Sequence, residues 1–213
     1  MKMGTLFSGI GAPEEALREL GIEHDVIFAC DNDEHAKKTY LKNNQPKCFY
    51  DDINKIDLSE IEKVDLLVFG FPCQPFSFAG KGCGMDDFRG KLVIKAINIL
   101  LKVKPKYFIA ENVPGLKAQE NGRTLKNLMK RMRNKGEYSV KYKTLDSKDF
   151  GVPQQRKRII IVGTRNDLDI DFKFPSPINS KTVLKDVLDI GVGKRFYATR
   201  DFLKKEKVQK RLK

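Results

Sequence analysis

The sequence contains no apolar run that approaches the roughly 20 residues of a membrane-spanning helix. Its four cysteines include no C-x-x-C pair and there are only two histidines, so we expect neither a zinc site nor a disulfide framework, and reduced thiols. The first apolar segment begins by Met3 with no signal segment ahead of it. These absences predict a cytoplasmic protein with no membrane anchor and no bound metal.

Positive charge, in contrast, is abundant. The chain has 41 lysines and arginines against 28 acidic residues, a net charge of +13 and a pI near 9.5. Such a surplus favours a polyanionic partner, because each neutralised phosphate releases condensed counterions. Residues 194–213 hold nine basic and two acidic residues, which indicates either a nucleic-acid contact or an arm that faces a partner.

Short apolar runs alternate with helical periodicity, a pattern that predicts an α/β sheet with crossover helices. Alternation in 138–142, followed by a turn and a second apolar run, predicts an antiparallel edge on a parallel sheet. FKFPSP, residues 172–177, is typical of a linker. Strands are expected at Met3–Phe7, Val26–Cys30, Val64–Phe69, Tyr107–Ala110 and Arg158–Gly163, and helices at Pro13–Leu20 and along the apolar stripes Val93, Ala96, Ile97, Leu100 and Leu125, Leu128, Met129, Met132.

The segment GFPCQPFSFAG, from Gly70 to Gly80, places a cysteine directly after an apolar strand. Pro72 and Pro75 fix φ and remove backbone donors, so Cys73 is expected in a bent, non-helical loop at the rim of the sheet. A reactive thiol suits that place, whereas the other three cysteines are expected to be inert.

The turn LFSGIGA, residues 6–12, joins the first strand to the first helix. Asp31 follows Gly11 by 20 residues at the end of the second strand, where a carboxylate can accept hydrogen bonds from ribose hydroxyls. A third glycine and a phosphate-cradling lysine are lacking, which weighs against a dinucleotide or a nucleoside triphosphate. The pattern therefore indicates an adenosine-containing cofactor.

Four segments in this order resemble the motifs of the cytosine carbon-5 DNA methyltransferases of bacteria and phages. They are LFSGIGAPEEAL from Leu6, GFPCQPFS from Gly70, ENVPGL from Glu111 and GVPQQRKRIIIVG from Gly151. The resemblance covers about residues 3–175. It implies a Rossmann-like S-adenosylmethionine-dependent methyltransferase fold, α/β in class, with a mostly parallel sheet, an antiparallel edge hairpin and helices on both faces.

The resemblance also implies the cofactor and the residues that bind it. The cofactor is S-adenosylmethionine, whose sulfonium needs no phosphate-binding loop. Asp52 matches the position that reads the adenine amino group, and Ile53 matches the position that packs on the adenine ring. The full set of cofactor-binding residues is Phe7, Ser8, Gly9, Gly11, Asp31, Asn32, Asp52, Ile53, Gly70, Pro72 and Leu92.

The implied reaction begins with a thiolate of Cys73 that adds to carbon-6 of cytosine and activates carbon-5 for methylation. Arg156 and Arg158 are the expected sources of positive charge near the thiolate. Glu111 fits the group that supplies a proton or a strong hydrogen bond at ring nitrogen 3, provided that partial burial lets it hold a proton.

The target base of double-stranded DNA must be flipped out of the helix before the thiolate can reach it. The residues expected to shape the base pocket or to grip the strand are Gln74, Ser77, Arg89, Asn112, Val113 and Gln155, together with the arginines of QQRKR.

The motif for target recognition and the final cofactor motif of the family are not found after Phe174. We therefore expect a catalytic domain at 1–175 and a basic linker or tail at 176–213, with target recognition supplied by a second polypeptide, in a restriction-modification system. Two alternatives stay open. One is an RNA cytosine methyltransferase, and the other is a truncated or non-catalytic nucleic-acid-binding remnant.

Overall fold

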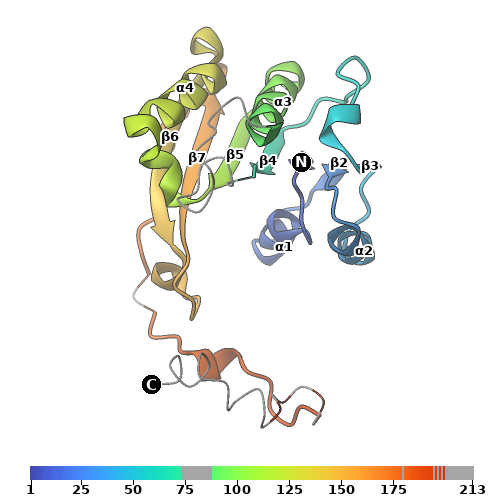
Figure 1. Ribbon diagram of the computed structural model, residues 1–213, viewed down its shortest axis with the longest axis vertical. Helices are drawn as coiled ribbons and strands as arrows, with labels where there is room; N and C mark the ends of the chain where they lie inside the picture. The colour runs from blue at the N-terminus through green and yellow to red at the C-terminus, as the bar shows by residue number, and fades with distance from the viewer. Residues whose placement is uncertain (73–87, 179, 194, 196, 198, 200–213) are drawn as a thin grey trace.

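The computed structural model describes residues 1–72, 88–178, 180–193, 195, 197 and 199, with residues 88–90 described for their backbone alone (Figure 1). Seven strands form one sheet in the order β3-β2-β1-β4-β5-β7-β6. Strands β1 to β5 pair in parallel, and β7 pairs antiparallel with both β5 and β6. The strands are β1 Lys2–Leu6, β2 Asp25–Cys30, β3 Cys48–Tyr50, β4 Leu66–Gly70, β5 Tyr107–Asn112, β6 Tyr138–Asp146 and β7 Lys157–Arg165.

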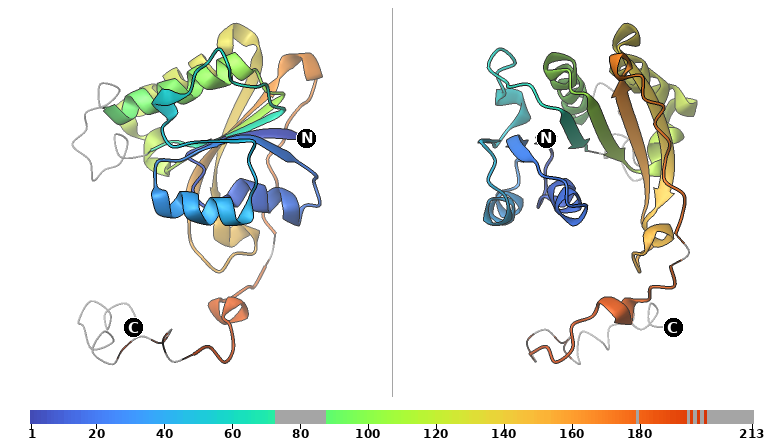
Figure 2. Two further views of the ribbon diagram at one scale, coloured as in Figure 1. Left: turned by 90° about the vertical axis from the view of Figure 1, so that its right-hand side faces the viewer. Right: turned by 180° about the vertical axis from the view of Figure 1, so that it is seen from behind.

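Helices cover both faces of this sheet (Figure 2). Helices α1 Ala12–Glu19 and α2 Glu34–Asn43 lie on one face, and α3 Phe88–Val103 and α4 Arg123–Met132 lie on the other. The predicted fold class, with its antiparallel edge, is confirmed. The 3-10 helices are η1 Ile53–Lys55, η4 Pro114–Lys117, η5 Gln119–Gly122, η6 Asn134–Gly136, η7 Ser147–Phe150, η8 Asn166–Leu168 and η9 Leu184–Val187.

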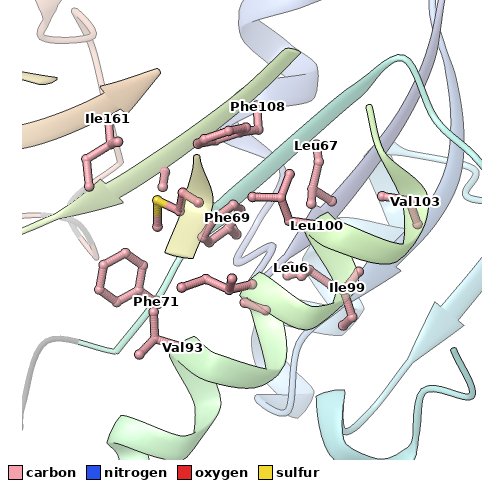
Figure 3. Packing of buried hydrophobic residues seen from close by; sticks show 14 of the residues in the cluster. Leu6, Leu67, Phe69, Phe71, Val93, Ile99, Leu100, Val103, Phe108 and Ile161 are labelled. Carbon is pink, nitrogen blue, oxygen red and sulfur yellow. The ribbon is translucent and has the colours of Figure 1, made fainter. Parts of the chain in front are cut away.

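The core lies between the sheet and α3, where Phe69, Phe108 and Leu100 are fully buried (Figure 3). Burial of each such side chain stabilises the fold by about 1.5–3 kcal/mol. The two predicted helical stripes are buried, which confirms that they pack against the sheet. Their exposed fractions are 0% for Val93 and Ala96, 2% for Ile97, 0% for Leu100, 5% for Leu125, 0% for Leu128, 6% for Met129 and 0% for Met132.

Helix α1 begins and ends as its sequence predicts. Pro13 lies in its first turn, and Gly21 beyond its last turn has a φ of 65° and donates its N–H to the carbonyl oxygen of Arg18. Helix α2 was not predicted individually, because Tyr40 is its only buried residue and one residue makes no stripe. The side chain of Asp33 caps α2 by accepting hydrogen bonds from His35 N and Ala36 N, both at 2.8 Å.

Residues 169–183 form no helix or strand where the structure describes them. It first runs beside β6, where Lys141 Nζ donates to Asp171 Oδ1 at 2.5 Å and to Phe172 O at 2.9 Å. It leads away from the sheet only beyond the tip of the hairpin of β6 and β7 (Figure 1). Ile178 N donates to Asp149 O at 2.8 Å, which joins the segment to the tip of the hairpin. Beyond that contact the apolar side chains are largely exposed, among them Ile178, Val183, Leu184, Val187, Leu188 and Ile190.

No helix within the described part of the chain is long and apolar enough to cross a membrane. Nor do three or more His, Cys, Asp or Glu side chains gather there in a group that could hold a metal ion.

Gly163 on β7 lies directly opposite Phe108 on β5, and the phenyl ring of Phe108 covers it. A Cβ atom at Gly163 would lie 1.9 Å from Cε1 of Phe108, so Gly163→Ala forces the buried ring to move. We expect the substitution to lower the free energy of unfolding by about 1–3 kcal/mol, measured by urea denaturation. Gly193→Ala is the control, because no atom of the described residues other than its chain neighbours lies within 4 Å of its Cβ position. Equal stabilities of the two variants would contradict this packing.

Candidate active site

The carboxyl ends of β1 to β5 meet at one edge of the sheet because these strands are parallel. Strand β7 runs the other way, so its first residues reach the same edge, with Ile159 opposite Asn112. The four sequence motifs therefore meet at this edge in the parts that the structure describes. Open α/β sheets bind their ligands at such an edge.

The turn after β1 is fixed to the end of β2. Ser8 N donates to Cys30 O at 3.0 Å, and Ser8 Oγ accepts from Cys30 N at 3.0 Å. Phe7 has a φ of 56°. This left-handed conformation costs a bulky residue free energy and persists only where the surrounding structure enforces it. Gly9 and Gly11 also have positive φ values, of 55° and 94°. The turn is therefore a rigid, backbone-lined wall.

Asp31 joins this turn to the loop after β2. Its Oδ2 accepts from Gly9 N at 2.7 Å and its Oδ1 accepts from Asp33 N at 2.9 Å. Each carboxylate oxygen can accept a further hydrogen bond, so both remain able to receive ribose hydroxyls. A hollow of about 450 Å³ adjoins it and is lined by residues that include Asn32, Lys37 and Asp51.

Asp52 and Ile53 lie at the start of η1, after β3. Asp52 Oδ1 accepts from Asn54 N at 2.9 Å and caps this short helix. Ile53 is 4% exposed and belongs to the core, so its packing on an adenine ring stays a prediction. Burial and then the carboxylates of Asp31, Asp52 and Asp51 raise the pKa of the Cys30 thiol to about 12. Lys37 pairs with Asp51, so the negative charge at this end of the edge comes from Asp31 and Asp52.

Glu111, near the end of β5, pairs with Arg158 at the start of β7. The distance from Arg158 Nε to Glu111 Oε1 is 2.6 Å, and the side chains are 25% and 35% exposed. Gly70 at the end of β4 lies beside this pair, since a Cβ atom built there would be 3.6 Å from Glu111 Oε2, an ordinary contact distance. Charged hydrogen bonds between half-buried groups fix orientation, so the Glu111 carboxylate is held toward the edge.

Asn112 holds the chain just ahead of Cys73. It is 1% exposed, its Nδ2 donates to Phe71 O at 3.0 Å, and its Oδ1 accepts from Val113 N at 2.8 Å. Both ends of its amide are thus occupied within the protein. Contact of Asn112 with a substrate stays a prediction, and its observed partners are the backbone of Phe71 and Val113.

The turn before β7 is fixed through its backbone. Arg156 N donates to Asp146 Oδ1 at 3.0 Å, while the side chains of Arg156 and Gln155 are exposed. The structure thus brings Arg158, and not Arg156, into contact with Glu111. Pro72 is half-buried at the last residue before the loop, and Leu92 on α3 packs against the core. Cys73, Gln74, Ser77 and the side chain of Arg89 lie outside the described residues.

A buried polar cluster beneath the glycine turn was missed by the sequence analysis. Glu14 is 0% exposed, and its Oε1 accepts from Tyr40 OH at 2.5 Å and from Thr5 Oγ1 at 3.1 Å. Thr5 Oγ1 and Ser8 Oγ lie 2.8 Å apart, which connects the cluster to the turn. Burial and the bond to Glu14 raise the pKa of Tyr40, so its hydroxyl remains a donor. No sequence signal distinguishes buried Glu14 from exposed Glu15.

The order of the strands and the placing of the helices define a methyltransferase fold, since solved methyltransferases match it closely. The Entamoeba histolytica methyltransferase EhMeth has a TM-score of 0.75 at 24% identity, over 97% of this chain and 65% of that chain. The S. pombe Dnmt2 methyltransferase has a TM-score of 0.72 at 23% identity, over 98% and 67%.

The family model for C-5 cytosine-specific DNA methylase matches residues 1–213, and the chain belongs to this family. Type II methyltransferase M.NgoBI of Neisseria gonorrhoeae is 42% identical over 184 residues, 86% of this chain and 56% of that protein. Orphan methyltransferase M.Rho11sI of Bacillus phage rho11s is 41% identical over 170 residues, 79% of this chain and 34% of that protein. The chain thus spans about half of M.NgoBI and less of the phage relative.

The raised pKa of Cys30, of which burial is the largest cause, gives a test of its surroundings. At about pH 8 its thiol stays protonated because its pKa lies near 12. We expect iodoacetamide to leave Cys30 unlabelled in the folded chain and to label it fully in urea, measured by peptide mass spectrometry. Labelling of Cys30 at the same rate in the folded and unfolded chain would contradict the buried, negative surroundings described above.

Proposed function

We propose that the chain carries the catalytic site of a DNA (cytosine-5-)-methyltransferase of a restriction-modification system. The observation that supports this most is the Glu111–Arg158 pair, which lies at the same edge as the Gly9–Asp31 wall. Between them the chain enters the loop of Cys73, with Phe71 held by Asn112. The names of the type II relatives agree with this activity.

S-adenosylmethionine is the cofactor that fits the negative end of this edge. The carboxylates near Cys30 repel phosphate groups and attract a sulfonium or an ammonium group. Asp31 would hold the ribose, Asp52 and Ile53 the adenine, and the turn at Phe7–Gly11 the methionine part, with Asn32, Gly70, Pro72 and Leu92 completing the walls. Bound there, the cofactor supplies an electrophilic methyl group.

Cys73 is the proposed nucleophile. Its sulfur would form a bond to carbon-6 of the flipped cytosine, and the electron pair of the ring double bond would move to carbon-5. Carbon-5 would then take the methyl group as the bond from that group to the sulfonium sulfur breaks and leaves a neutral thioether. Loss of the carbon-5 proton and then of the sulfur restores the aromatic ring. Glu111 supplies a proton or a strong hydrogen bond to ring nitrogen 3, and its ion pair with Arg158 orients the carboxyl group. Val113, next to Asn112, forms part of the pocket wall.

Double-stranded DNA is the proposed substrate. The net charge of +13 suits a polyanion, and a flipped base needs a phosphate grip to hold its strand. Gln74, Ser77, Arg89, Gln155 and Arg156 are the proposed gripping residues. The exposed side chains of Gln155 and Arg156 are free to reach a bound strand at the site edge.

Target recognition is proposed to come from residues outside these 213, on a second polypeptide or on a longer chain. Residues 1–175 then form the catalytic domain, and 176–213 the connection to the recognition region. The exposed apolar side chains between Ile178 and Ile190 support this, because a row of such residues is typical of a surface that another folded part covers.

The nucleophile can be tested with DNA that contains 5-fluorocytosine, since fluorine blocks the final elimination and traps the covalent intermediate. We expect the wild-type chain and Cys83→Ala to form a complex with this DNA that survives denaturing electrophoresis in the presence of S-adenosylmethionine. Cys73→Ala should form none. An adduct that persists in the Cys73 variant would refute the assignment, and one formed only on RNA would favour the RNA alternative.

The cofactor site can be tested by calorimetry with S-adenosylmethionine. Asp31→Ala removes the acceptor of Gly9 N and the proposed partner of the ribose, so we expect at least about tenfold weaker binding, since charged hydrogen bonds contribute about 1.5–3 kcal/mol each. Asp57→Ala, which removes an exposed carboxylate bonded to Ser59, is the control. Equal affinities of the two variants would mean that Asp31 does not bind the ribose.

A further inference from the structure

Basic side chains are concentrated on the helices α3 and α4, which cover one face of the sheet. Residues 91–135, which contain most of α3 and all of α4, hold twelve lysines and arginines against two glutamates, a net charge of +10. Residues 1–65, which contain α1 and α2, hold eight basic and fourteen acidic residues, a net charge of −6. The two helix pairs cover opposite faces (Figure 2). Helix α3 from Lys91 onward and α4 together carry seven basic residues and no acidic one, whereas α1 and α2 together carry four of each, so the face of α3 and α4 is the basic one.

The exposed side of α4 is basic along its whole length. Its buried side consists of Thr124 and four apolar residues, and no acidic residue occurs from Arg123 to Met132. The exposed cations on and just after α4 are Arg123, Lys126, Lys130, Arg131, Arg133 and Lys135. Among the described residues, the ion pairs of the structure involve none of them.

Helix stability does not account for this arrangement. Lys130 and Arg131 lie in the last turn, where cations interact favourably with the helix dipole. Arg123, however, occupies the first position of the helix, where a cation is unfavourable. Lys126 and Lys130 are also four residues apart, so that their like charges repel each other. A solvated surface would gain from mixed charges, whereas a uniform row of cations is suited to an anionic partner that offsets their repulsion.

A hollow of about 480 Å³ between α3 and α4 presents donors suited to phosphate. Its lining combines cations with side-chain amides: Ile97, Asn98, Leu101, Asn127, Lys130, Arg131, Asn134 and Lys135. Both helices follow parallel strands, so both begin at the edge that carries Glu111. A duplex held at that edge can therefore continue over the basic face.

We propose that the outer face of α3 and α4 is a second DNA contact, which binds phosphate groups beyond the target base without reading sequence. The proposal rests on the proposed function only for the identity of the polyanion as duplex DNA. Its role is to hold and orient the duplex while the separate edge site acts on the base.

The test is the salt dependence of binding by the full chain to a duplex of A·T pairs alone, which offers no target cytosine. Lys126→Gln/Lys130→Gln/Arg131→Gln removes three charges from the face. Lys42→Gln/Lys55→Gln/Lys63→Gln removes three exposed charges from the acidic segment 1–65 and is the matched control. Because each phosphate contact contributes about 0.9 to the slope of log affinity against log salt, we expect the first variant to lower the slope by roughly 2–3 and the control to leave it nearly unchanged.

Protection from acetylation provides a second readout that needs no variant. Duplex DNA should protect Lys126 and Lys130 of the wild-type chain and leave Lys42 and Lys55 reactive. Three outcomes would each overturn the proposal. They are equal slope changes in the two triple variants, an unchanged slope in the α4 variant, and a lower slope of the α4 variant that is seen with duplex RNA alone. Trapping by 5-fluorocytosine is measured separately with the recognition region supplied, so a chain that then fails to form the adduct but keeps the α4-dependent slope refutes the catalytic proposal alone.

Discussion

The reversed direction of β7 is the constraint on which the candidate site depends. If β7 were parallel to β5, its first residues would lie at the opposite edge of the sheet, far from Glu111. Antiparallel pairing sets Ile160 opposite Glu111 and allows Arg158 Nε to approach the Glu111 carboxylate to 2.6 Å. Strand β6 pairs with β7 along its full length and fixes this register. The edge hairpin therefore positions a charged group of the site as well as completing the sheet.

The helices and strands could be predicted wherever burial leaves a continuous apolar run or a periodic pattern of apolar residues in the sequence. Strands β1, β4, β5 and β7 are buried apolar runs, and α3 and α4 each bury one stripe, so the sequence marks them clearly. Strand β3 has only three residues, all half-buried, and α2 buries Tyr40 alone. The buried hydrogen bonds of Glu14 also escape such patterns, because they join residues from three separate elements.

The sequence named residues that the structure brings to one edge of the sheet, but it did not predict their contacts. The order of the motifs placed Asp31, Glu111 and Arg158 in one site, and the topology shows why they share an edge. It did not distinguish Arg158, which contacts Glu111, from Arg156, whose backbone is bonded to Asp146. It also suggested that Asn112 forms part of a pocket wall, and the amide of Asn112 is hydrogen-bonded to the backbone of Phe71 and Val113. Such distinctions depend on side-chain direction, which spacing alone does not determine.

The edge of the sheet is electrically graded, and the gradient matches the two molecules proposed to meet there. Asp31 and Asp52 make the β2–β3 end negative, since Asp51 is paired with Lys37. The exposed Arg156 makes the β7 end positive, since Arg158 is paired with Glu111. A cationic methyl donor is attracted to the first end and an anionic nucleic-acid strand to the second. Strands β1, β4 and β5 lie between these ends, and the proposed reaction has the methyl group and the base approach each other near Gly70 and Glu111, ahead of the Cys73 loop. Exchange of the charges at the two ends would separate the reactants even if every hydrogen bond of the site were kept.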